Sequence, residues 1–272
     1  MPIQHQAASK RENFPVASFW LPPRARNNIL ILYDFLRGAD DISDNPKLEA
    51  QERKEALDAI VDAFHSHRKQ VLPPWAKRYY ELVNRGQLRA YHGDLLLQAF
   101  MQDTQKTRYQ NWAELIGYCS KSAAPVGRAV LELCQERDAD IEASDALCSV
   151  LQIINHIQDM KDDFQQLDRI YLPQDWMKLH KVSEAMLAKG DMSLELRALM
   201  NHILDECDAM VEASRPIISS IQSTRLRIQI ATIWQIAKAL IEQLRHNDPL
   251  AQKVKLSKQQ QFGCLIRGML MR

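Results

Sequence analysis

The chain has 272 residues, of which 46% are hydrophobic, and its 35 basic and 34 acidic residues leave a formal net charge of +1. This length supplies one large hydrophobic core or two modest ones, and charges of both signs so interspersed create no field that would draw the chain onto nucleic acid. Only eight glycines occur and none forms a Gly-x-Gly pair, which argues against a Rossmann dinucleotide site.

The cysteines and the N-terminus indicate a cellular compartment. Five dispersed cysteines, an odd number, favour reduced and buried thiols over a disulfide framework, and no histidine spacing suits zinc. The first 13 residues are polar and lack the apolar stretch of a signal peptide, and no apolar run approaches the length that spans a bilayer. We therefore expect a cytoplasmic protein that could bind peripherally to the inner face of the membrane.

Helical periodicity runs through nearly the whole chain, and no run alternates as a strand would. Apolar residues recur at helical spacing over 29–42, 147–157 and 228–244. No repeat of fixed period and no low-complexity linker is present. The prediction is an all-α fold with about ten or more helices in one domain over 1–272, residues 1–12 being flexible. Prolines stand where helices would begin or end, at Pro22-Pro23, Pro46, Pro73-Pro74, Pro173, Pro216 and Pro249.

The first segment with chemical potential runs from Tyr33 to Asp44 and follows an apolar helix. If that helix continues, Asp40, Asp41 and Asp44 stand three, four and seven residues after Arg37 and share one face with it. Carboxylates at such spacing repel each other, and a hard divalent cation with oxygen ligands would offset that repulsion.

The second segment places amide and carboxylate groups on one helical stripe. Gln152, Asn155, Asp159 and Asp163 step by three, four and four residues, while the opposite stripe is apolar. Such a line of oxygens can hold Mg²⁺ and leave positions for phosphate oxygens of a substrate. His156 is expected to point off this stripe and to serve a structural role.

A simpler interpretation competes with the metal site, because acidic residues at helical spacing more often form a solvated face. Two such segments, each within a strongly apolar helix and each with an extra polar residue in register, favour the metal site. The tryptophans Trp20, Trp112 and Trp234 are interpreted as core anchors.

Three ordered motifs resemble those of squalene and phytoene synthases. The first is Ser18-Phe19 before Leu-Pro-Pro-Arg, together with Leu-Tyr-Asp-Phe-Leu-Arg-Gly-Ala-Asp-Asp-Ile-Ser-Asp. The second is Tyr-Cys-Ser-Lys-Ser-Ala-Ala-Pro-Val-Gly, which begins at Tyr118. The third is Gln-x-x-Asn-x-x-x-Asp-x-x-x-Asp, which begins at Gln152 and precedes Arg-Ile-Tyr-Leu-Pro. The resemblance covers about 13–173 and continues more weakly toward the C-terminus.

This resemblance implies a helical bundle of the isoprenoid (terpenoid) synthase type with a central cavity. It implies that Mg²⁺ is the cofactor and that a prenyl diphosphate is the substrate. Asp41 and Asp162 would face neighbouring side chains or solvent. Tyr171 would either close the pocket or only pack against neighbouring residues. Gly127 would either face the substrate or permit close packing of two helices. The implied metal ligands are Asp40, Asp44, Asn155, Asp159 and Asp163; the implied catalytic residues are these four aspartates with Tyr118; the implied substrate-binding residues are Ser18, Phe19, Tyr33, Arg37, Ala123, Gly127, Gln152, Asn155, Arg169 and Tyr171.

Within the family, the chain resembles the bacterial hydroxysqualene synthase branch of the hopanoid-type squalene route. Asn-Phe-Pro-Val-Ala-Ser-Phe at Asn13 and Ser-Ala-x-Pro-Val-Gly at Ser122 carry this likeness. Condensing relatives often have His-Ser-x-Ser-Phe and Val-Ala-Gly there, so Pro15 and Val16 replace a His and a Ser that would help to bind diphosphate.

The branch implies a lyase that ionises presqualene diphosphate and lets water capture the rearranged cation, which gives hydroxysqualene and diphosphate. A presqualene diphosphate synthase would supply the substrate. A second possibility is a transferase that condenses two farnesyl diphosphates to presqualene diphosphate, squalene or dehydrosqualene. A third is a non-catalytic helical assembly factor, although such proteins typically lose the aspartates. The prenyl chain length, the number of Mg²⁺ ions and the oligomeric state stay open.

The C-terminal stretch 252–272 is predicted to be an amphipathic basic helix. The favoured interpretation is a helix that docks on the bundle with a solvated basic face, and the alternative is a helix that rests on an anionic membrane. No functional residue is predicted after Arg215. The cations of this stretch are Lys253, Lys255, Lys258, Arg267 and Arg272, and its apolar residues are Phe262, Leu265, Ile266, Met269 and Leu270.

Overall fold

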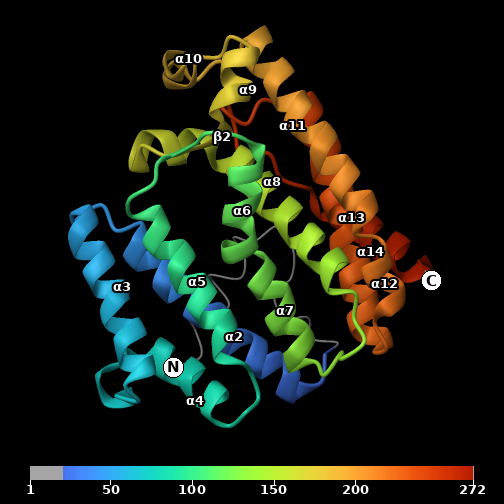
Figure 1. The fold of residues 1–272 in the computed structure, drawn as a ribbon. Coiled ribbons are helices and arrows are strands. Elements are labelled where there is room, and N and C mark those ends of the chain that lie inside the picture. Colours follow the sequence, from blue (N-terminus) through green and yellow to red (C-terminus); the bar gives the residue numbers. More distant parts are fainter. Residues whose placement is uncertain (1–20, 272) are drawn as a thin grey trace.

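The computed structural model describes residues 21–271, in which the long helix α8 lies between α6 and α7 on one side and α11 and α13 on the other (Figure 1). The described part contains thirteen α-helices, one short 3₁₀ helix and two short strands, which confirms the all-α prediction. The N-terminal half forms α2 (Pro23–Ser43), α3 (Ala50–His65), η1 (Lys69–Val71), α4 (Pro74–Asn84), α5 (Ala90–Asp103), β1 (Arg108–Tyr109), α6 (Trp112–Ser122) and α7 (Ala124–Leu133). The C-terminal half forms α8 (Ile141–Leu167), β2 (Ile170–Pro173), α9 (Gln174–Leu179), α10 (Glu184–Lys189), α11 (Leu194–Ala213), α12 (Pro216–Ser220), α13 (Thr224–His246) and α14 (Lys258–Leu270).

Helix starts follow from local sequence chemistry. Four helices (α2, α4, α7 and α12) begin with a proline in the first turn, where a missing N–H costs nothing. Other starts carry a side chain that accepts a hydrogen bond from a free backbone N–H of the first turn. These N-caps are Asn111 of α6, Asp140 of α8, Ser193 of α11, Ser223 of α13 and Ser257 of α14.

The chain reverses sharply where α8 ends. Asp168 follows the helix in the left-handed region with φ of 50°, and Arg108 holds it through a hydrogen bond from Nη2 to its Oδ1 at 2.8 Å. Strands β1 and β2 then pair in parallel, with Arg108 opposite Ile170. The sequence analysis did not predict these strands, which are too short for an alternating pattern to register. Their pairing returns Arg169 and Tyr171 toward the C-terminal half of α8.

The C-terminal helix is shorter than predicted, because 252–257 is extended chain rather than helix. Ser257 and Gln260 form a capping box that starts α14 at Lys258. The chain before α14 is tied to α8, since Gln158 Nε2 donates to the carbonyl of Val254 and Lys161 Nζ donates to that of Leu250. No helix within residues 21–271 has the length and hydropathy that a bilayer-spanning segment requires.

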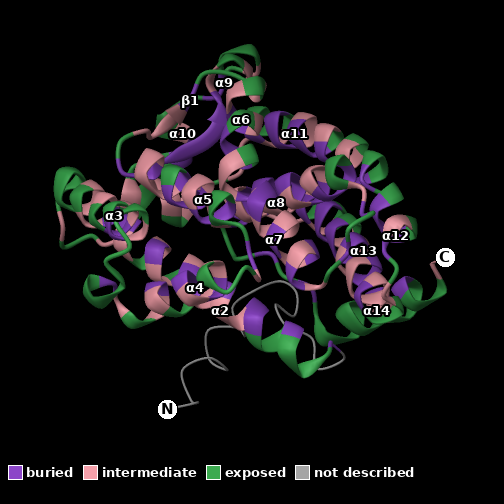
Figure 2. Cartoon of the chain, turned by 60° about the horizontal axis from the view of Figure 1, so that its bottom comes forward, coloured by how far each residue is buried: buried purple, intermediate pink, exposed green. Residues whose placement is uncertain are grey.

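Buried residues line the inward faces of the helices, and exposed residues lie on the outer faces (Figure 2). Close contact between α2 and α4 shows how tightly some of these faces meet. Phe35 stacks on Tyr79 with ring centroids 4.0 Å apart, and Arg78 bonds Asp34 at 2.6 Å. A Cβ atom placed on Gly38 would lie 2.3 Å from the Trp75 ring, so this pair of helices requires a glycine there.

We predict opposite effects for two glycine-to-alanine changes in helices. Gly38→Ala should lower the free energy of unfolding by about 1–3 kcal/mol, since the added methyl overpacks the contact between α2 and α4. Gly117→Ala should raise it by roughly 0.5–1 kcal/mol, because nothing lies within 4 Å of that position and alanine is the better helix former. Urea denaturation measures both changes, and a stabilised Gly38→Ala protein would contradict the packing described here.

Candidate active site

A cavity of about 600 Å³ lies between the inward faces of the central helices. Along α2 its lining changes from Ile29 and Leu32 to Asp40, and along α8 it changes from Leu147 to Asp163. The cavity therefore has a polar end at the C-terminal parts of α2 and α8 and an apolar end at their N-terminal parts. Helices α6 and α7 run antiparallel to α2 and α8. The residues with which they line the cavity therefore change from Tyr118 at the polar end to apolar residues further along the chain.

The first acidic segment ends α2 at the polar end. Arg37 donates to Asp40 at 2.9 Å and contacts Asp41 at 3.1 Å. Asp41 is exposed and is not among the residues that line the cavity. The helix stops at Ser43, so Asp44 is its C-cap rather than a member of the predicted helical stripe. Asp44 still faces the cavity, because Arg169 Nη1 bonds it at 2.6 Å.

The second acidic segment matches its prediction more closely. Gln152, Asn155, Asp159 and Asp163 all line the cavity from α8. Asp159 forms an ion pair with Lys253, which comes from the extended chain before α14. The two acidic segments therefore meet across the polar end, as the sequence pattern requires of a shared site.

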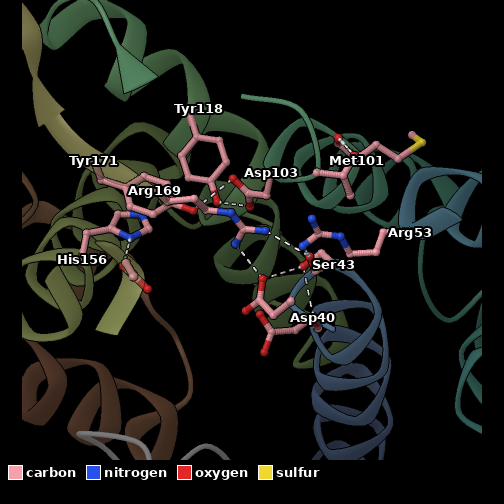
Figure 3. Close-up of polar contacts among 12 residues, drawn as sticks. Asp40, Ser43, Arg53, Met101, Asp103, Tyr118, His156, Arg169 and Tyr171 are labelled. Carbon is pink, nitrogen blue, oxygen red and sulfur yellow. Dashed lines mark hydrogen bonds and ion pairs between the residues drawn. The ribbon is translucent and has the colours of Figure 1, made fainter. Parts of the chain in front are cut away.

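Arg169 joins these segments to a buried network of hydroxyl and carboxyl groups (Figure 3). Its Nη2 donates to the carbonyl of Ser43 at 3.0 Å. Nearby, Tyr118 donates to Asp103 Oδ2 at 2.6 Å and Tyr171 donates to Oδ1 at 3.1 Å. A single carboxyl thus fixes the hydroxyls of two tyrosines that come from motifs far apart in the sequence.

Asp103, the last residue of α5, was not predicted from the sequence as a site residue. Its signal is weak: it continues the helical spacing of Leu96 and Phe100, both of which face inward. From the sequence alone, a single aspartate at the end of an apolar helix would be interpreted as a helix cap or as a solvent-exposed residue at the helix end. Only the burial of Asp103 beneath two tyrosines reveals its part in the site.

His156 lies at the cavity wall, contrary to the prediction that it points off the acidic stripe. Its ring stacks on Tyr171 with centroids 3.6 Å apart, and its Nε2 lies 3.2 Å from Nε2 of Gln152. The reversal at Asp168 brings Tyr171 back over α8, and that stacking draws the ring toward the cavity. Burial, with the charge of Arg169, lowers the pKa of His156 to about 3, so the imidazole is neutral.

Burial and mutual repulsion make the carboxyls of the polar end reluctant to ionise. Burial, then the charge of Asp44, raises the pKa of Asp40 to about 7. Burial, then the charge of Asp159, raises the pKa of Asp163 to about 8. Burial raises the pKa of Asp103 to about 7, although Arg169 opposes the shift. A bound cation would favour the ionised forms of the carboxyls beside it.

The donor set suits Mg²⁺ that shares its coordination with a substrate. Within residues 21–271, no three His, Cys, Asp or Glu side chains are grouped so that they could hold one metal ion. Mg²⁺ usually takes one or two carboxylates and completes its shell with water and phosphate oxygens. The carboxylates on α2 and α8 fit that pattern, since each helix offers a carboxylate pair at the cavity.

The structure brings every described residue of the predicted site to one cavity. Ser18 and Phe19 lie outside the described residues, as does Trp20. Gly127 both lines the cavity and packs closely, because a Cβ there would lie 2.6 Å from Cys148 Sγ. The predicted residues that line the cavity are Tyr33, Arg37, Asp40, Asp44, Tyr118, Ala123, Gly127, Gln152, Asn155, Asp159, Asp163, Arg169 and Tyr171. Lining residues that were not predicted include Asp103, Ser122, His156, Gln229 and Lys253.

Comparison with known proteins places this fold and cavity in one family. The sequence model of squalene/phytoene synthases matches residues 7–260, so the chain belongs to the squalene/phytoene synthase family and is an enzyme of that family. The chain is 37% identical to the hydroxysqualene synthase of Rhodopseudomonas palustris over 247 residues, 90% of this chain and 83% of that protein. It is 35% identical to the hydroxysqualene synthase of Sinorhizobium fredii over 251 residues, 92% of this chain and 85% of that protein.

Solved structures confirm the predicted fold type. The squalene synthase HpnC from Alicyclobacillus acidocaldarius superposes with a TM-score of 0.72 and 26% identity, covering 90% of this chain and 95% of that one. A dehydrosqualene synthase superposes with a TM-score of 0.79 and 21% identity, covering 97% of this chain and 93% of that one. The chain therefore has the all-α fold of squalene synthase-type isoprenoid synthases.

The carboxyl pKa shifts predict how stability depends on pH when metal is absent. A carboxyl whose pKa is higher in the folded than in the unfolded state stabilises the fold at low pH, and that stability is lost as the pH rises through the folded value. With Asp40 and Asp103 near 7 and Asp163 near 8, the melting temperature in EDTA should fall between about pH 6.5 and pH 8.5. Below about pH 6.5 the lowered pKa of His156 opposes part of the fall, so the range above it reports the carboxyls alone.

Thermal unfolding in EDTA across that pH range measures the effect. Asp163→Asn should flatten the curve by up to about 1.4 kcal/mol per pH unit, the contribution of one proton. A melting temperature that stays level or rises toward pH 8.5 in the unsubstituted protein would contradict the burial of these carboxyls.

Proposed function

We propose that this protein converts presqualene diphosphate to hydroxysqualene and diphosphate in a Mg²⁺-dependent reaction of squalene biosynthesis. The observation that carries the proposal is a single cavity with an acidic, arginine-containing end and an apolar end. A diphosphate on two hydrocarbon arms has the same division of chemistry. The names of the hydroxysqualene synthase relatives and the motif at Ser122 support the particular reaction.

The polar end would hold the leaving group. Asp40, Asp44, Asn155, Asp159 and Asp163 would bind Mg²⁺, which would neutralise the charge that develops on the departing diphosphate. Arg169 is fixed by Asp44 and the Ser43 carbonyl, and a guanidinium so placed can bind phosphate oxygens. Arg37 stands over the same end on α2 and can do the same.

The walls beyond the polar end would shape the cation that remains. Tyr118 and Tyr171 cannot turn freely, because Asp103 holds both hydroxyls, and aromatic faces stabilise a nearby cation. The small side chain of Ala123 would leave room for a hydrocarbon arm at the junction of α6 and α7, and Gly127 lets α7 pack closely on α8. The apolar lining excludes bulk water, which protects the cation until one water molecule captures it.

Two other functions are distinguishable from this one. Condensation of two farnesyl diphosphates is supported by the names of structural relatives, a squalene synthase and a dehydrosqualene synthase. In the proposed reaction a separate presqualene diphosphate synthase would supply the substrate instead. A non-catalytic assembly role would leave the two facing acidic segments without a purpose.

Product analysis in water labelled with ¹⁸O tests the proposal. Protein with Mg²⁺ is given farnesyl diphosphate in one tube and presqualene diphosphate in another, without NADPH. We expect ¹⁸O-labelled hydroxysqualene from the second tube alone, and none when EDTA replaces Mg²⁺. Presqualene diphosphate in the first tube would establish the condensing function, and no product in either tube would favour the assembly role.

Adjacent aspartates provide a matched pair of variants for this assay. Asp40→Asn should lower the rate at least about a hundredfold, since it removes a charged ligand from the site of the developing charge. Asp41→Asn should stay within about threefold, because Asp41 is exposed outside the cavity. Equal losses in the two variants would mean that a general charge effect, rather than a metal site, explains the aspartates.

We further propose that α14 contacts an anionic membrane surface from the cytoplasm. The helix docks on α13 with Gly268 against Thr232, and its outer face carries exposed apolar side chains beside the exposed cations Lys258 and Arg267. Phe262 is 63% exposed and Leu270 is 77% exposed, with Ile266 and Met269 beside them. After Asp248 the sequence has five cations and no acidic residue. An apolar face flanked by cations is typical of helices that lie in the membrane interface.

Co-sedimentation with vesicles tests this contact. We expect binding to phosphatidylglycerol vesicles that weakens at high salt, and a loss of at least about fivefold for Phe262→Glu combined with Leu270→Glu. Leu179→Glu is the control, since Leu179 is 67% exposed on α9. Equal binding by the α14 variant and the unsubstituted protein would contradict the proposal.

A further inference from the structure

Gln152 carries an amide group on the cavity wall, and His156 binds one end of that amide. Gln152 Nε2 lies 3.2 Å from His156 Nε2. Because an amide NH₂ group can only donate, the imidazole Nε2 accepts this hydrogen bond and the ring proton is on Nδ1. Nδ1 faces Asp163, whose Oδ2 is 4.0 Å away. The contact directs the amide nitrogen toward the ring and leaves the amide oxygen, Oε1, for another partner.

The amide oxygen of Gln152 is accessible from the cavity. No donor within residues 21–271 bonds it, and it does not belong to the buried polar atoms of this part of the chain that lack a partner. An oxygen that is neither bonded nor sealed in the interior must reach the space that its residue lines, which is the cavity. Such an oxygen can accept a hydrogen bond from a water molecule.

A succession of contacts fixes the direction of this amide. Tyr171 donates to the buried carboxyl of Asp103 at 3.1 Å (Figure 3). Its ring stacks on His156 with centroids 3.6 Å apart and planes inclined by 12°, so the imidazole cannot rotate without losing this stacking. Since His156 in turn binds the nitrogen of the Gln152 amide, the oxygen is held on the side away from the ring.

Gln152 lies at the boundary between the polar and apolar parts of the cavity. It precedes Asn155, the first expected metal ligand of α8, by three residues, which is about 4.5 Å along the helix axis. Leu151 and Leu147, on its other side in the chain, line the apolar part. If the diphosphate lies among the carboxylates, the carbon that it leaves lies close to this boundary.

We propose that the amide oxygen of Gln152 holds the water molecule that captures the cation, and that His156 is the positioning residue for this amide. This inference rests on the proposed function. Gln152 Oε1 accepts a hydrogen bond from the water, and a lone pair of the water oxygen faces the cationic carbon. The water oxygen forms the new C–O bond, and one of its protons passes to the released diphosphate. One substrate and one water thus give the alcohol and hydrogen diphosphate, with no redox change.

The test measures diphosphate release and products together, with presqualene diphosphate as substrate in ¹⁸O-labelled water. Gln152→Met keeps the length of the side chain but removes the oxygen. The share of alcohol among the products should therefore fall about tenfold, as loss of one well-placed hydrogen bond allows, and hydrocarbons formed by proton loss should replace it. His156→Phe keeps a ring against Tyr171 but no longer holds the amide, and should lower the share of alcohol about threefold.

His202→Phe is the matched control for the histidine variant. His202 also stacks on an aromatic ring, that of Trp176, with centroids 4.0 Å apart, and its Nδ1 lies 3.1 Å from His180 Nε2. It does not line the cavity. The control should therefore leave the share of alcohol unchanged, and a fall equal to that of His156→Phe would overturn the role of His156.

The outcomes separate the proposed function from the role of Gln152. Wild-type protein that forms no hydroxysqualene overturns both together. Wild-type protein that forms it, with an unchanged share of alcohol from Gln152→Met, overturns only the role of Gln152. A Gln152→Met protein that is folded by circular dichroism but releases no diphosphate would also overturn that role, because Gln152 would then act before the capture of water.

Discussion

The ion pair between Arg169 and Asp44 is the contact on which the layout of the cavity depends. Arg169 is buried, and its two terminal nitrogens bind the Asp44 carboxylate and the Ser43 carbonyl at the end of α2. Since Arg169 follows directly on the reversal after α8, this contact links the ends of both acidic helices. A guanidinium buried so deeply is tolerated only when oxygens satisfy it, so the two helix ends cannot separate without a large cost. The distance between the acidic segments is fixed by that requirement.

Electrostatics at the polar end follows from the same packing. Three cations, Arg37, Arg169 and Lys253, line the cavity with a larger number of carboxyl groups, and burial raises the pKa of Asp40, Asp103 and Asp163. Ionised carboxylates at this end repel one another, and added positive charge would reduce that repulsion. Under the proposed function, a metal bound together with a diphosphate would bring positive charge and further ligands, and carboxylates grouped in pairs rather than in a closed cage fit that arrangement.

The sequence predicts the parts of the site that have a helical period and misses those that depend on packing. Gln152, Asn155, Asp159 and Asp163 were predictable because one helix fixes their spacing. Arg169 and Tyr171 were predictable only through family resemblance, since their place results from the reversal at Asp168. Asp103 and Lys253 come from α5 and from the chain before α14, and neither belongs to a pattern. That the whole chain forms one domain, and that the predicted residues have their assigned roles, stay predictions.

The contrast between Asp103 and Ser122 shows how polar groups divide their tasks in this cavity. Asp103 is buried, and each of its carboxyl oxygens accepts a hydrogen bond from a tyrosine, so it fixes the hydroxyls of Tyr118 and Tyr171. Ser122 is half-buried at the end of α6, and its Oγ has no hydrogen-bond partner among residues 21–271. In a close-packed interior, satisfied polar groups hold the shape of a site, and unsatisfied ones are retained where a ligand completes them.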